Sequence, residues 1–585
     1  MTITKVNFDP DKKRIEDIFE GSLMLVIPRY QRTYSWSRDK AEEFYDDFIE
    51  ESDKAEDNLA FLGTILFAIN EDGRLEVIDG QQRLITITIF LAALRDVLKS
   101  LDISDAEFAA QQIQNKITVS STFGSSYTKA EMNKPKLQVG AEINDIFEKV
   151  IYKSSDDAKT VKTRNSAEKK VLDAYVFFVK KLKDMLNRPK LYAPDKIKLA
   201  AMLLSKINAI EYIDIRVTNK EVAYNLFESH NAKGVALAKT DLIKNYYFGR
   251  LTGNDIDKNH KMDEWDRLLD DLDNNINTSF MQPDRFFYYM VQSYEGNFSS
   301  HNLYRRIKPL MHNHQAFFKT LKTNVNLMIE LKNSNTGDRE IDRVLVALNE
   351  KLRVNQCFIL LLSVWRNKER LSPTLCRKIF HVVEEFTYIY SGVTNSPANA
   401  LEKVYSKHAK WIEDTLKESD HSGDHDKEIL TGRLLKALKA DLKDLKPNYN
   451  IFLESFAGLQ YTNLAQRKII RYTFEMIEYH YSKGIVALGE NFTLDHIVPQ
   501  KKAKGALFHS IGNLTPMSAS ENSAKGSNDA SFDNYLDISN FYSAKMLNDQ
   551  LLANDNIFDE NSIQERIAYL SSYTFNEVFA TILGK

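Results

Sequence analysis

An aspartate, a histidine and two asparagines near the C-terminal end form the series Asp495-His496, Asn513 and Asn522. Phosphodiester hydrolysis needs a base for the attacking water, and a neutral imidazole suits that role near pH 7. A cation must also neutralise the departing oxygen, and Mg²⁺ prefers oxygen ligands such as a carboxylate and an amide. Neighbouring side chains on a strand point to opposite sides, so Asp495 can hold the metal while His496 faces the water.

Asn513 lies at the turn between these residues, where it would brace the loop or orient the histidine. From His496 to Asn528 the chain has four lysines, among them Lys525, and one acid, Glu521. Such a local basic patch can contact phosphates. The alternative is a core histidine with turn asparagines and a solvated lysine face.

A second group of polar and aromatic residues occupies 27–36, with the sequence IPRYQRTYSW. Arginine contacts phosphate, and aromatic rings stack on bases. The arginines and aromatic rings of this segment could therefore contact nucleic acid, whereas Tyr34 and Trp36 are expected in the core.

The segment Asp79-Gly80-Gln81-Gln82-Arg83 joins an expected strand to an expected helix. Main-chain N–H groups at a helix start form an anion site, to which Arg83 adds charge. Asp79 would hold Mg²⁺ or position a water. No Walker loop is present, and the alternative is a simple Asp-Gly turn with helix capping.

A third polar segment, 227–245, includes Asn231 and Lys244, which are weaker candidates for the same site. Thr240 is the expected cap of a helix within this segment.

These residues need elements that hold them. Apolar runs at 61–69 and 75–79 predict a hairpin, and helical spacing follows from 82 to about 100. The rest is mostly helical, with the aromatic run 286–289 expected in the core. A change of pattern near 445 gives three predicted regions: 1–254, 255–440 and 441–585.

Composition excludes several classes of protein. The chain has 585 residues, 43% hydrophobic and 27% charged, with 78 Lys+Arg against 81 Asp+Glu. These values are typical of globular proteins with substantial cores. The two cysteines, Cys357 and Cys376, argue against a disulfide framework. No apolar stretch approaches the roughly 20 residues of a membrane span. Residues 1–14 also lack the apolar core of a signal peptide. We therefore expect a cytoplasmic protein without a membrane partner.

The motifs together resemble the GmrSD-type modification-dependent restriction endonucleases. Their N-terminal domain is ParB-like and carries the motif that stands here as Asp79 to Arg83. Their C-terminal domain resembles the HNH, or His-metal finger, nucleases with a ββα-metal fold. The implied fold is α+β and predominantly helical: a ParB-like N-terminal domain, a helical middle and the HNH domain.

The resemblance also implies roles for individual residues. His496 becomes the general base, Asp495 and Asn522 the ligands of Mg²⁺ or Mn²⁺, and Asn513 a structural asparagine. In the N-terminal domain, Asp79 would act in hydrolysis of GTP, ATP or CTP. The remaining candidates would bind the nucleotide or DNA: Gly80, Gln81, Gln82, Arg83, Asn231 and Lys244 for the nucleotide, and Tyr30, Gln31, Arg32 and Lys525 for DNA.

The expected activity is nicking or cleavage of foreign, modified DNA in anti-phage defence, gated by nucleotide hydrolysis. Substrates of the wider family include DNA with glucosylated hydroxymethylcytosine and DNA with phosphorothioate links, and a homodimer is compatible with the family. Two other readings stay open: a ParB-like, nucleotide-controlled DNA-binding switch without cleavage, and a toxin nuclease that acts on RNA.

Overall fold

The structure is a computed structural model, in which the chain divides into two compact units, Met1–Met262 and Asp263–Lys585. Each unit is described by itself. The structure describes residues 10–20, 24–50, 60–69, 74–119, 134–153, 161–188, 191–218, 222–223, 226, 238–251, 255–274, 281–418, 424–483, 492–499, 505–518, 541–553, 555 and 557–580.

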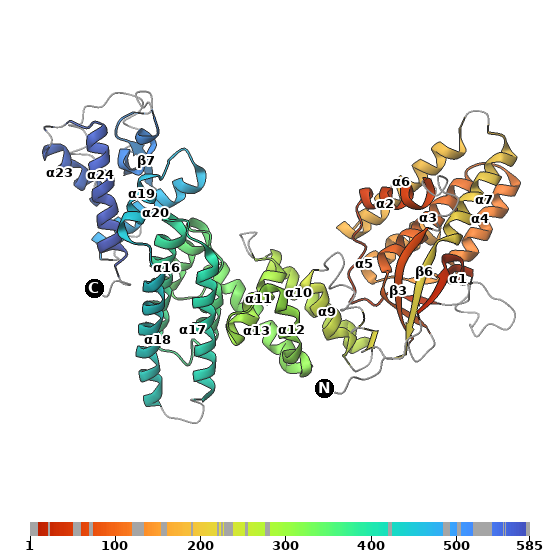
Figure 1. Cartoon of the computed structure of the whole chain (residues 1–585), viewed down its shortest axis with the longest axis horizontal. Coiled ribbons are helices and arrows are strands. Elements are labelled where there is room, and N and C mark those ends of the chain that lie inside the picture. The colour runs from red at the N-terminus through yellow and green to blue at the C-terminus, as the bar shows by residue number, and fades with distance from the viewer. Residues whose placement is uncertain are drawn as a thin grey trace. The chain divides into compact units, whose positions relative to one another are not determined.

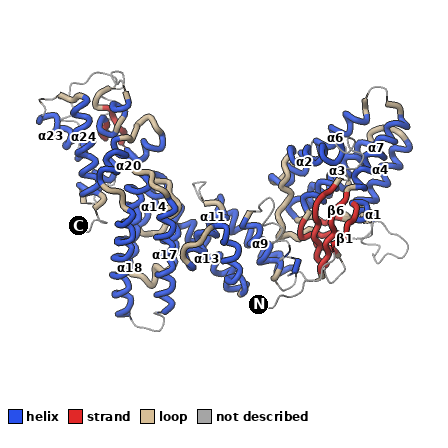
Figure 2. The backbone as a smooth tube through the Cα atoms, in the orientation of Figure 1, coloured by secondary structure: helices blue, strands red, loops and turns tan. Residues whose placement is uncertain are grey.

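The N-terminal unit is built on a six-stranded mixed sheet with the order β1-β6-β3-β4-β2-β5. Figure 2 shows these strands in red. Their bounds are β1 (Pro10–Arg14), β2 (Leu25–Val26), β3 (Phe61–Ile69), β4 (Leu75–Asp79), β5 (Leu137–Gln138) and β6 (Glu211–Val217). β2 runs parallel to both of its neighbours, β4 and β5. The carboxyl ends of these three strands therefore lie at one edge of the sheet.

The predicted hairpin of 61–69 and 75–79 is confirmed. β3 and β4 pair antiparallel, with Ile69 opposite Leu75 and Leu66 opposite Asp79. Side chains alternate between the two faces of the sheet: Ile65 and Phe67 enter the main core, whereas Leu66 packs into a smaller cluster on the other face.

Helices cover the main face of this sheet, where Figure 1 shows α2, α3, α6 and α7 together. The predicted helix from 82 to about 100 is confirmed as α3 (Gln81–Lys99), which is buried along almost its whole length. It packs against α4 and α6. The other helices of the unit are α1 (Ile15–Glu20), α2 (Arg38–Tyr45), α4 (Ser104–Ile117), α5 (Ala141–Ile146), α6 (Ser166–Leu186), α7 (Ala193–Ala209) and α9 (Lys239–Gly249).

One expected cap is wrong. The residue before α9 is Ala238, and no side chain caps this helix, so Thr240 lies in its first turn instead. Tyr34 is buried and its hydroxyl bonds Thr86 Oγ1 at 3.0 Å, which confirms its place in the core. Trp36 packs against the same core from a half-buried position.

The described part of the second unit is helical apart from one small hairpin, β7 (Phe492–His496) and β8 (Leu514–Ser518). The chain is therefore predominantly helical α+β, as expected. The main helices here are α11 (Pro283–Glu295), α13 (His314–Lys332), α14 (Arg339–Val346), α15 (Phe358–Arg366), α16 (Pro373–Thr387), α17 (Ala398–Glu418), α18 (Asp424–Leu445), α19 (Tyr449–Ala457), α20 (Leu464–Tyr481), α23 (Tyr542–Ala553) and α24 (Glu560–Tyr573). α10 (Asp255–Asn274) crosses the division between the units.

The expected burial of the aromatic run 286–289 is confirmed for three of its four residues. Phe286, Phe287 and Tyr289 belong to the core, whereas Tyr288 is half-buried. Cys357 and Cys376 are buried free thiols, and burial raises the pKa of each above its ordinary value. Within the described ranges, no helix combines the length and the apolar character that a bilayer crossing requires.

Candidate functional site

The C-terminal candidates lie on the β7–β8 hairpin. His496 pairs with Leu514, and Asp495 pairs with Thr515. Burial alternates along β7: the His496 side chain is buried and that of Asp495 is half-buried. The two neighbours thus occupy opposite faces of the hairpin, as predicted.

Asn513 is fully buried and braces the chain that follows β7. Its Oδ1 accepts from the Val498 amide at 2.8 Å, and its Nδ2 donates to the Val498 carbonyl at 3.1 Å and to the Phe508 carbonyl at 2.7 Å. Its own carbonyl accepts from the Ile497 amide at 2.9 Å. These bonds fix the turn that leaves His496.

Two aromatic rings surround the imidazole of His496. The Tyr461 ring stands edge-on to it at a centroid separation of 4.9 Å and 87°, and the His509 ring at 5.8 Å and 81°. The Tyr461 amide donates to the His509 carbonyl at 2.8 Å. Arg467 stacks on Tyr461 at 4.2 Å and donates to its carbonyl. Sequence reasoning missed these contacts, although the short distance from His509 to Asn513 in the chain was a usable signal.

α24 supports the hairpin from behind. Gly512 has no room for a side chain, because an added Cβ would lie 2.6 Å from the Ile563 carbonyl oxygen. Arg566 is buried and donates to the Leu514 carbonyl at 3.1 Å. Burial lowers the pKa of Arg566 to about 9. A buried guanidinium thus contacts the residue that pairs with His496.

Asn522 and Lys525 lie outside the described residues, so the structure places only Asp495 of the two expected metal ligands. In the described ranges, no group of three or more His, Cys, Asp or Glu side chains gathers for a metal. One carboxylate, that of Asp495 on β7, is chemically suited to Mg²⁺. This ion keeps several waters and binds through one or two carboxylates and substrate phosphates. The donor set is therefore compatible with a magnesium ion.

The N-terminal candidates gather at the carboxyl ends of β2 and β4. In open α/β sheets, ligands bind beyond the carboxyl ends of strands. β4 ends at Asp79, Gly80 turns the chain with φ of 91°, and α3 starts at once. The Gly80 amide donates to Asp79 Oδ1 at 2.8 Å. The loop after β2 is brought to the same edge, where the Gln31 Nε2 donates to the Ile78 carbonyl at 3.2 Å.

The two motif glutamines hold this loop. Gln82 Oε1 accepts from the Ser35 amide at 2.8 Å, and its Nε2 donates to the Thr33 carbonyl at 3.0 Å. Gln81 Nε2 reaches the Arg32 carbonyl at 3.5 Å. The structure therefore gives both glutamines a positioning role, and direct nucleotide binding by them stays a prediction.

Arg83 holds the start of β3. Its guanidinium donates to the carbonyls of Leu62 at 2.7 Å and Thr64 at 2.9 Å. Asp79 lies 3.8 Å from the same guanidinium. Burial lowers the pKa of Arg83, and the Asp79 charge opposes that shift. Asp79 itself is half-buried, which leaves part of its carboxylate accessible at the strand end.

The third polar segment reaches the same part of the unit through α9. Tyr30 and Leu242 of α9 both pack against the small cluster that includes Ile78. Lys244 lies on this helix with a half-buried side chain, and Asn231 lies outside the described residues.

Three buried polar atoms at this edge have no hydrogen-bond partner in the described part of the chain: Gln31 Oε1, Arg32 Nε and Gln81 Oε1. Buried polar groups without partners are uncommon. Two acceptors and one donor near Asp79 and the start of α3 give this edge the polar character of a ligand site.

Two known protein families match this chain, and one match falls in each of its two compact units. Residues 15–248 match the family described as GmrSD restriction endonuclease, N-terminal domain. Residues 446–572 match the family described as GmrSD restriction endonucleases, C-terminal domain. A search of curated proteins found no match.

Proposed function

The chain belongs to the GmrSD restriction endonucleases, whose N- and C-terminal domains it carries in order, and from this premise we propose how it cuts DNA. The C-terminal domain acts as an HNH nuclease with His496 as general base. The N-terminal domain binds and hydrolyses a nucleoside triphosphate and controls cleavage. Foreign, modified DNA is the proposed substrate.

The observation that carries the nuclease proposal is the hairpin geometry. Asp495 and His496 occupy opposite faces of β7, and Asn513 fixes the turn that follows them. His496 would take the proton of the attacking water, since a neutral imidazole is an efficient base near pH 7. Asp495, with Asn522, would hold a Mg²⁺ ion, which supplies positive charge to the departing oxygen when bound.

The proposed nucleotide site is the edge where β2 and β4 end. The amides at the start of α3 form an anion site for phosphate groups, with Asp79 beside them as the carboxylate that positions water or metal. Gln81, Gln82 and Arg83 would act by holding the loops around this site, given their bonds to main-chain carbonyls. Tyr30 and Arg32 on the neighbouring loop are the proposed DNA contacts.

The test is cleavage of supercoiled plasmid in Mg²⁺, with unmodified, phosphorothioated and hydroxymethylcytosine-containing plasmids, each with and without an NTP mixture. We expect open circles or linear DNA from wild type on one modified plasmid and none from His496→Ala. Chelation of the divalent metal should also stop cleavage. Intact plasmid throughout, with the NTP still consumed, would favour a nucleotide-controlled DNA-binding switch.

The two domains are separated by two variants. His496→Ala should keep wild-type NTP turnover, because the imidazole lies in the other unit from the nucleotide site. Asp79→Asn should lower turnover. Loss of turnover in His496→Ala would contradict the modular division, and unchanged turnover in Asp79→Asn would assign Asp79 to turn formation alone.

A further inference from the structure

A cavity of about 690 Å³ in the second unit lies outside both proposed sites. Its walls come from α14, α16, α18, α20 and the turn that follows α24. Four cationic side chains line it, against three glutamates: Arg343, Lys378, Lys439 and Lys483, against Glu384, Glu385 and Glu577. His381 and His480 also line it. Helices distant in sequence thus bring several cations to one concave surface.

One of the three acids is already neutralised. Arg343 makes a bidentate ion pair with the buried Glu384, at 2.8 and 2.7 Å, and the Tyr472 hydroxyl donates to the same carboxylate at 2.7 Å. Lys378 and Lys483 are exposed, and neither ammonium has an ion-pair partner in the described ranges. Arg343 Nε is buried and likewise without an acceptor there. With Arg343 paired to Glu384, three lysines face two glutamates in this cavity, which is a formal excess of one positive charge.

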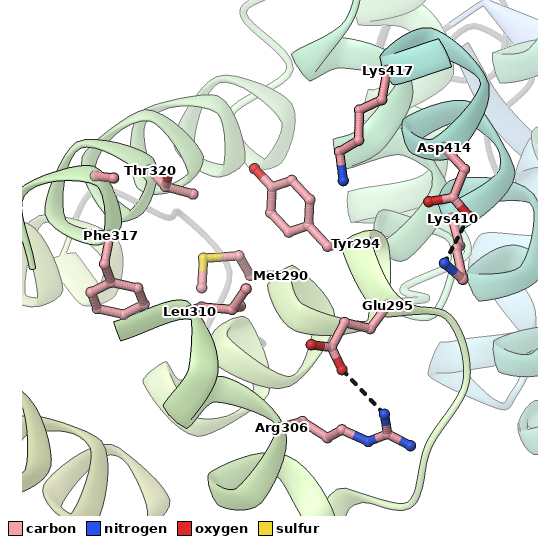
Figure 3. A pocket seen from close by; sticks show the side chains of 11 residues that line it. Met290, Tyr294, Glu295, Arg306, Leu310, Phe317, Thr320, Lys410, Asp414 and Lys417 are labelled. Carbon is pink, nitrogen blue, oxygen red and sulfur yellow. Dashed lines mark hydrogen bonds and ion pairs between the residues drawn. The ribbon is translucent and has the colours of Figure 1, made fainter. Parts of the chain in front are cut away.

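A second cavity of the same unit offers a comparison of charge. This cavity of about 640 Å³ has Arg306, Lys410 and Lys417 on its walls (Figure 3). Arg306 pairs with Glu295 at 3.6 Å, and Lys410 pairs with Asp414 at 2.7 Å. Two of its three cations are thus matched by acids of the same cavity, and Lys417 leaves a formal excess of one positive charge there as well.

Aromatic rings continue from the first cavity onto the surface. His480 on its wall stands edge-on to Tyr573 at 6.0 Å. Tyr573 lies 6.0 Å from Tyr542, which stacks on Tyr481 at 3.6 Å and 11°. Tyr481 is 52% exposed. Exposed tyrosine faces stack on nucleobases, and lysines contact the adjoining phosphates.

We propose that this cavity and the adjoining tyrosines bind a nucleotide phosphate ester, either in a DNA strand or in a free nucleotide. Lys378 and Lys483 contact the phosphate, and the face of Tyr481 that is turned away from Tyr542 provides the stacking surface for the base. The site is distinct from the nucleotide site at Asp79 and from the nuclease centre at His496. It would give the nuclease-bearing unit its own contact with nucleic acid or nucleotide.

The test is acetylation footprinting of the full-length His496→Ala protein, which leaves DNA intact. Mass spectrometry measures labelling of Lys378 and Lys483 alone, with a 5′-phosphorylated single-stranded oligonucleotide, or with an NTP mixture. We expect labelling of both lysines to fall at least threefold with one ligand, while the exposed lysines Lys319 and Lys403 keep theirs. Protection by the oligonucleotide alone identifies a DNA strand, and protection by NTP alone identifies a free nucleotide.

Unchanged labelling of Lys378 and Lys483 in both arms would overturn the proposal, and so would equal protection of all four lysines. The double variant Lys378→Ala/Lys483→Ala should weaken binding of a protecting oligonucleotide at least tenfold. For an oligonucleotide, the slope of log K against log salt should fall by about 1.4, or about 0.7 per lost single-strand phosphate contact. Lys319→Ala/Lys403→Ala removes the same charge elsewhere in the unit and should keep wild-type binding.

Discussion

The side chain of Asn513 binds both main-chain polar atoms of Val498: Oδ1 accepts from the amide at 2.8 Å and Nδ2 donates to the carbonyl at 3.1 Å. One amide thus acts as a clamp on the turn after the His496 strand. Val498 lies just beyond the end of β7, and the Asn513 side chain binds its main-chain groups as a neighbouring strand would. The end of the two-stranded hairpin is held in place in this way.

Replacement of Asn513 should disable the nuclease by loosening the turn that follows His496. Asn513→Ala removes the partner of three half-buried main-chain groups, at up to about 1–3 kcal/mol for each. Asn513→Asp keeps the acceptor for the Val498 amide but sets a carboxylate beside two carbonyls. We expect both variants to lower kcat for plasmid nicking at least tenfold with a small change in KM. Wild-type kcat in Asn513→Ala would show that the clamp does not position His496.

The ring of Tyr461, rather than its hydroxyl, should matter for cleavage. The ring packs edge-on against the His496 imidazole, and Arg467 stacks on it. Tyr461→Phe keeps these contacts and should nick DNA at the wild-type rate. Tyr461→Ala removes them and should slow nicking severalfold. A loss of activity in Tyr461→Phe would instead assign a chemical role to the hydroxyl.

The sequence predicted elements and motifs better than it predicted partners. Strands 61–69 and 75–79 were recognisable because short apolar runs flanked a turn, and α3 because its apolar residues follow helical spacing. Such local sequence patterns do not predict which residues meet in the tertiary structure. Tyr461 is far from His496 in the chain, so only the fold reveals that their rings meet.

The same limit applies to the residues of the Asp79–Arg83 motif. Their residue types suggested ligand binding, but the side chains of Gln82 and Arg83 donate hydrogen bonds to the carbonyls of Thr33, Leu62 and Thr64. A polar residue in a sequence motif can bind a ligand or hold the loop that does. Hydrogen-bond geometry distinguishes these roles, and residue type and spacing do not.

Gly63 should be intolerant of alanine because of Arg83. Gly63 has φ of 94°, and an added Cβ would lie 2.5 Å from Arg83 Nη1. Alanine there would combine backbone strain of about 1–2 kcal/mol with displacement of the guanidinium from its two carbonyls. Gly337 provides a matched control, since its φ is 83° and an added Cβ meets nothing within 4 Å.

We expect Gly63→Ala to speed hydrogen exchange at residues 61–69 and 81–85 and to lower NTP turnover. Gly337→Ala carries the strain alone and should leave both measurements as in wild type. Equal exchange in the two variants would show that Arg83 moves without loss of its bonds.

The ion pair of Arg343 and Glu384 should make the second unit sensitive to acid. Burial alone raises the pKa of Glu384, but the Arg343 charge and hydrogen bonds from His381 and Arg343 outweigh it, and the pKa falls from 4.5 to about 2. A carboxyl group with a lowered pKa stabilises the folded state above its ordinary pKa. That stabilisation is lost as the pH falls towards the folded-state value.

The difference in stability between wild type and Glu384→Gln should therefore become smaller as the pH falls. Near pH 6 the variant leaves Arg343 without its buried partner, a loss of about 3–5 kcal/mol. Between about pH 4.5 and 2 the wild type itself loses stability on the order of 3 kcal/mol, at about 1.4 kcal/mol per pKa unit.

Thermal unfolding followed by tryptophan fluorescence measures this difference, because Trp265, Trp365 and Trp411 all lie in the second unit. Glu565→Gln, at an exposed acid of α24, should show a small and constant difference in Tm. A Tm gap for Glu384→Gln that stays constant from pH 6 to pH 2.5 would show that this carboxylate does not set the acid stability of the unit.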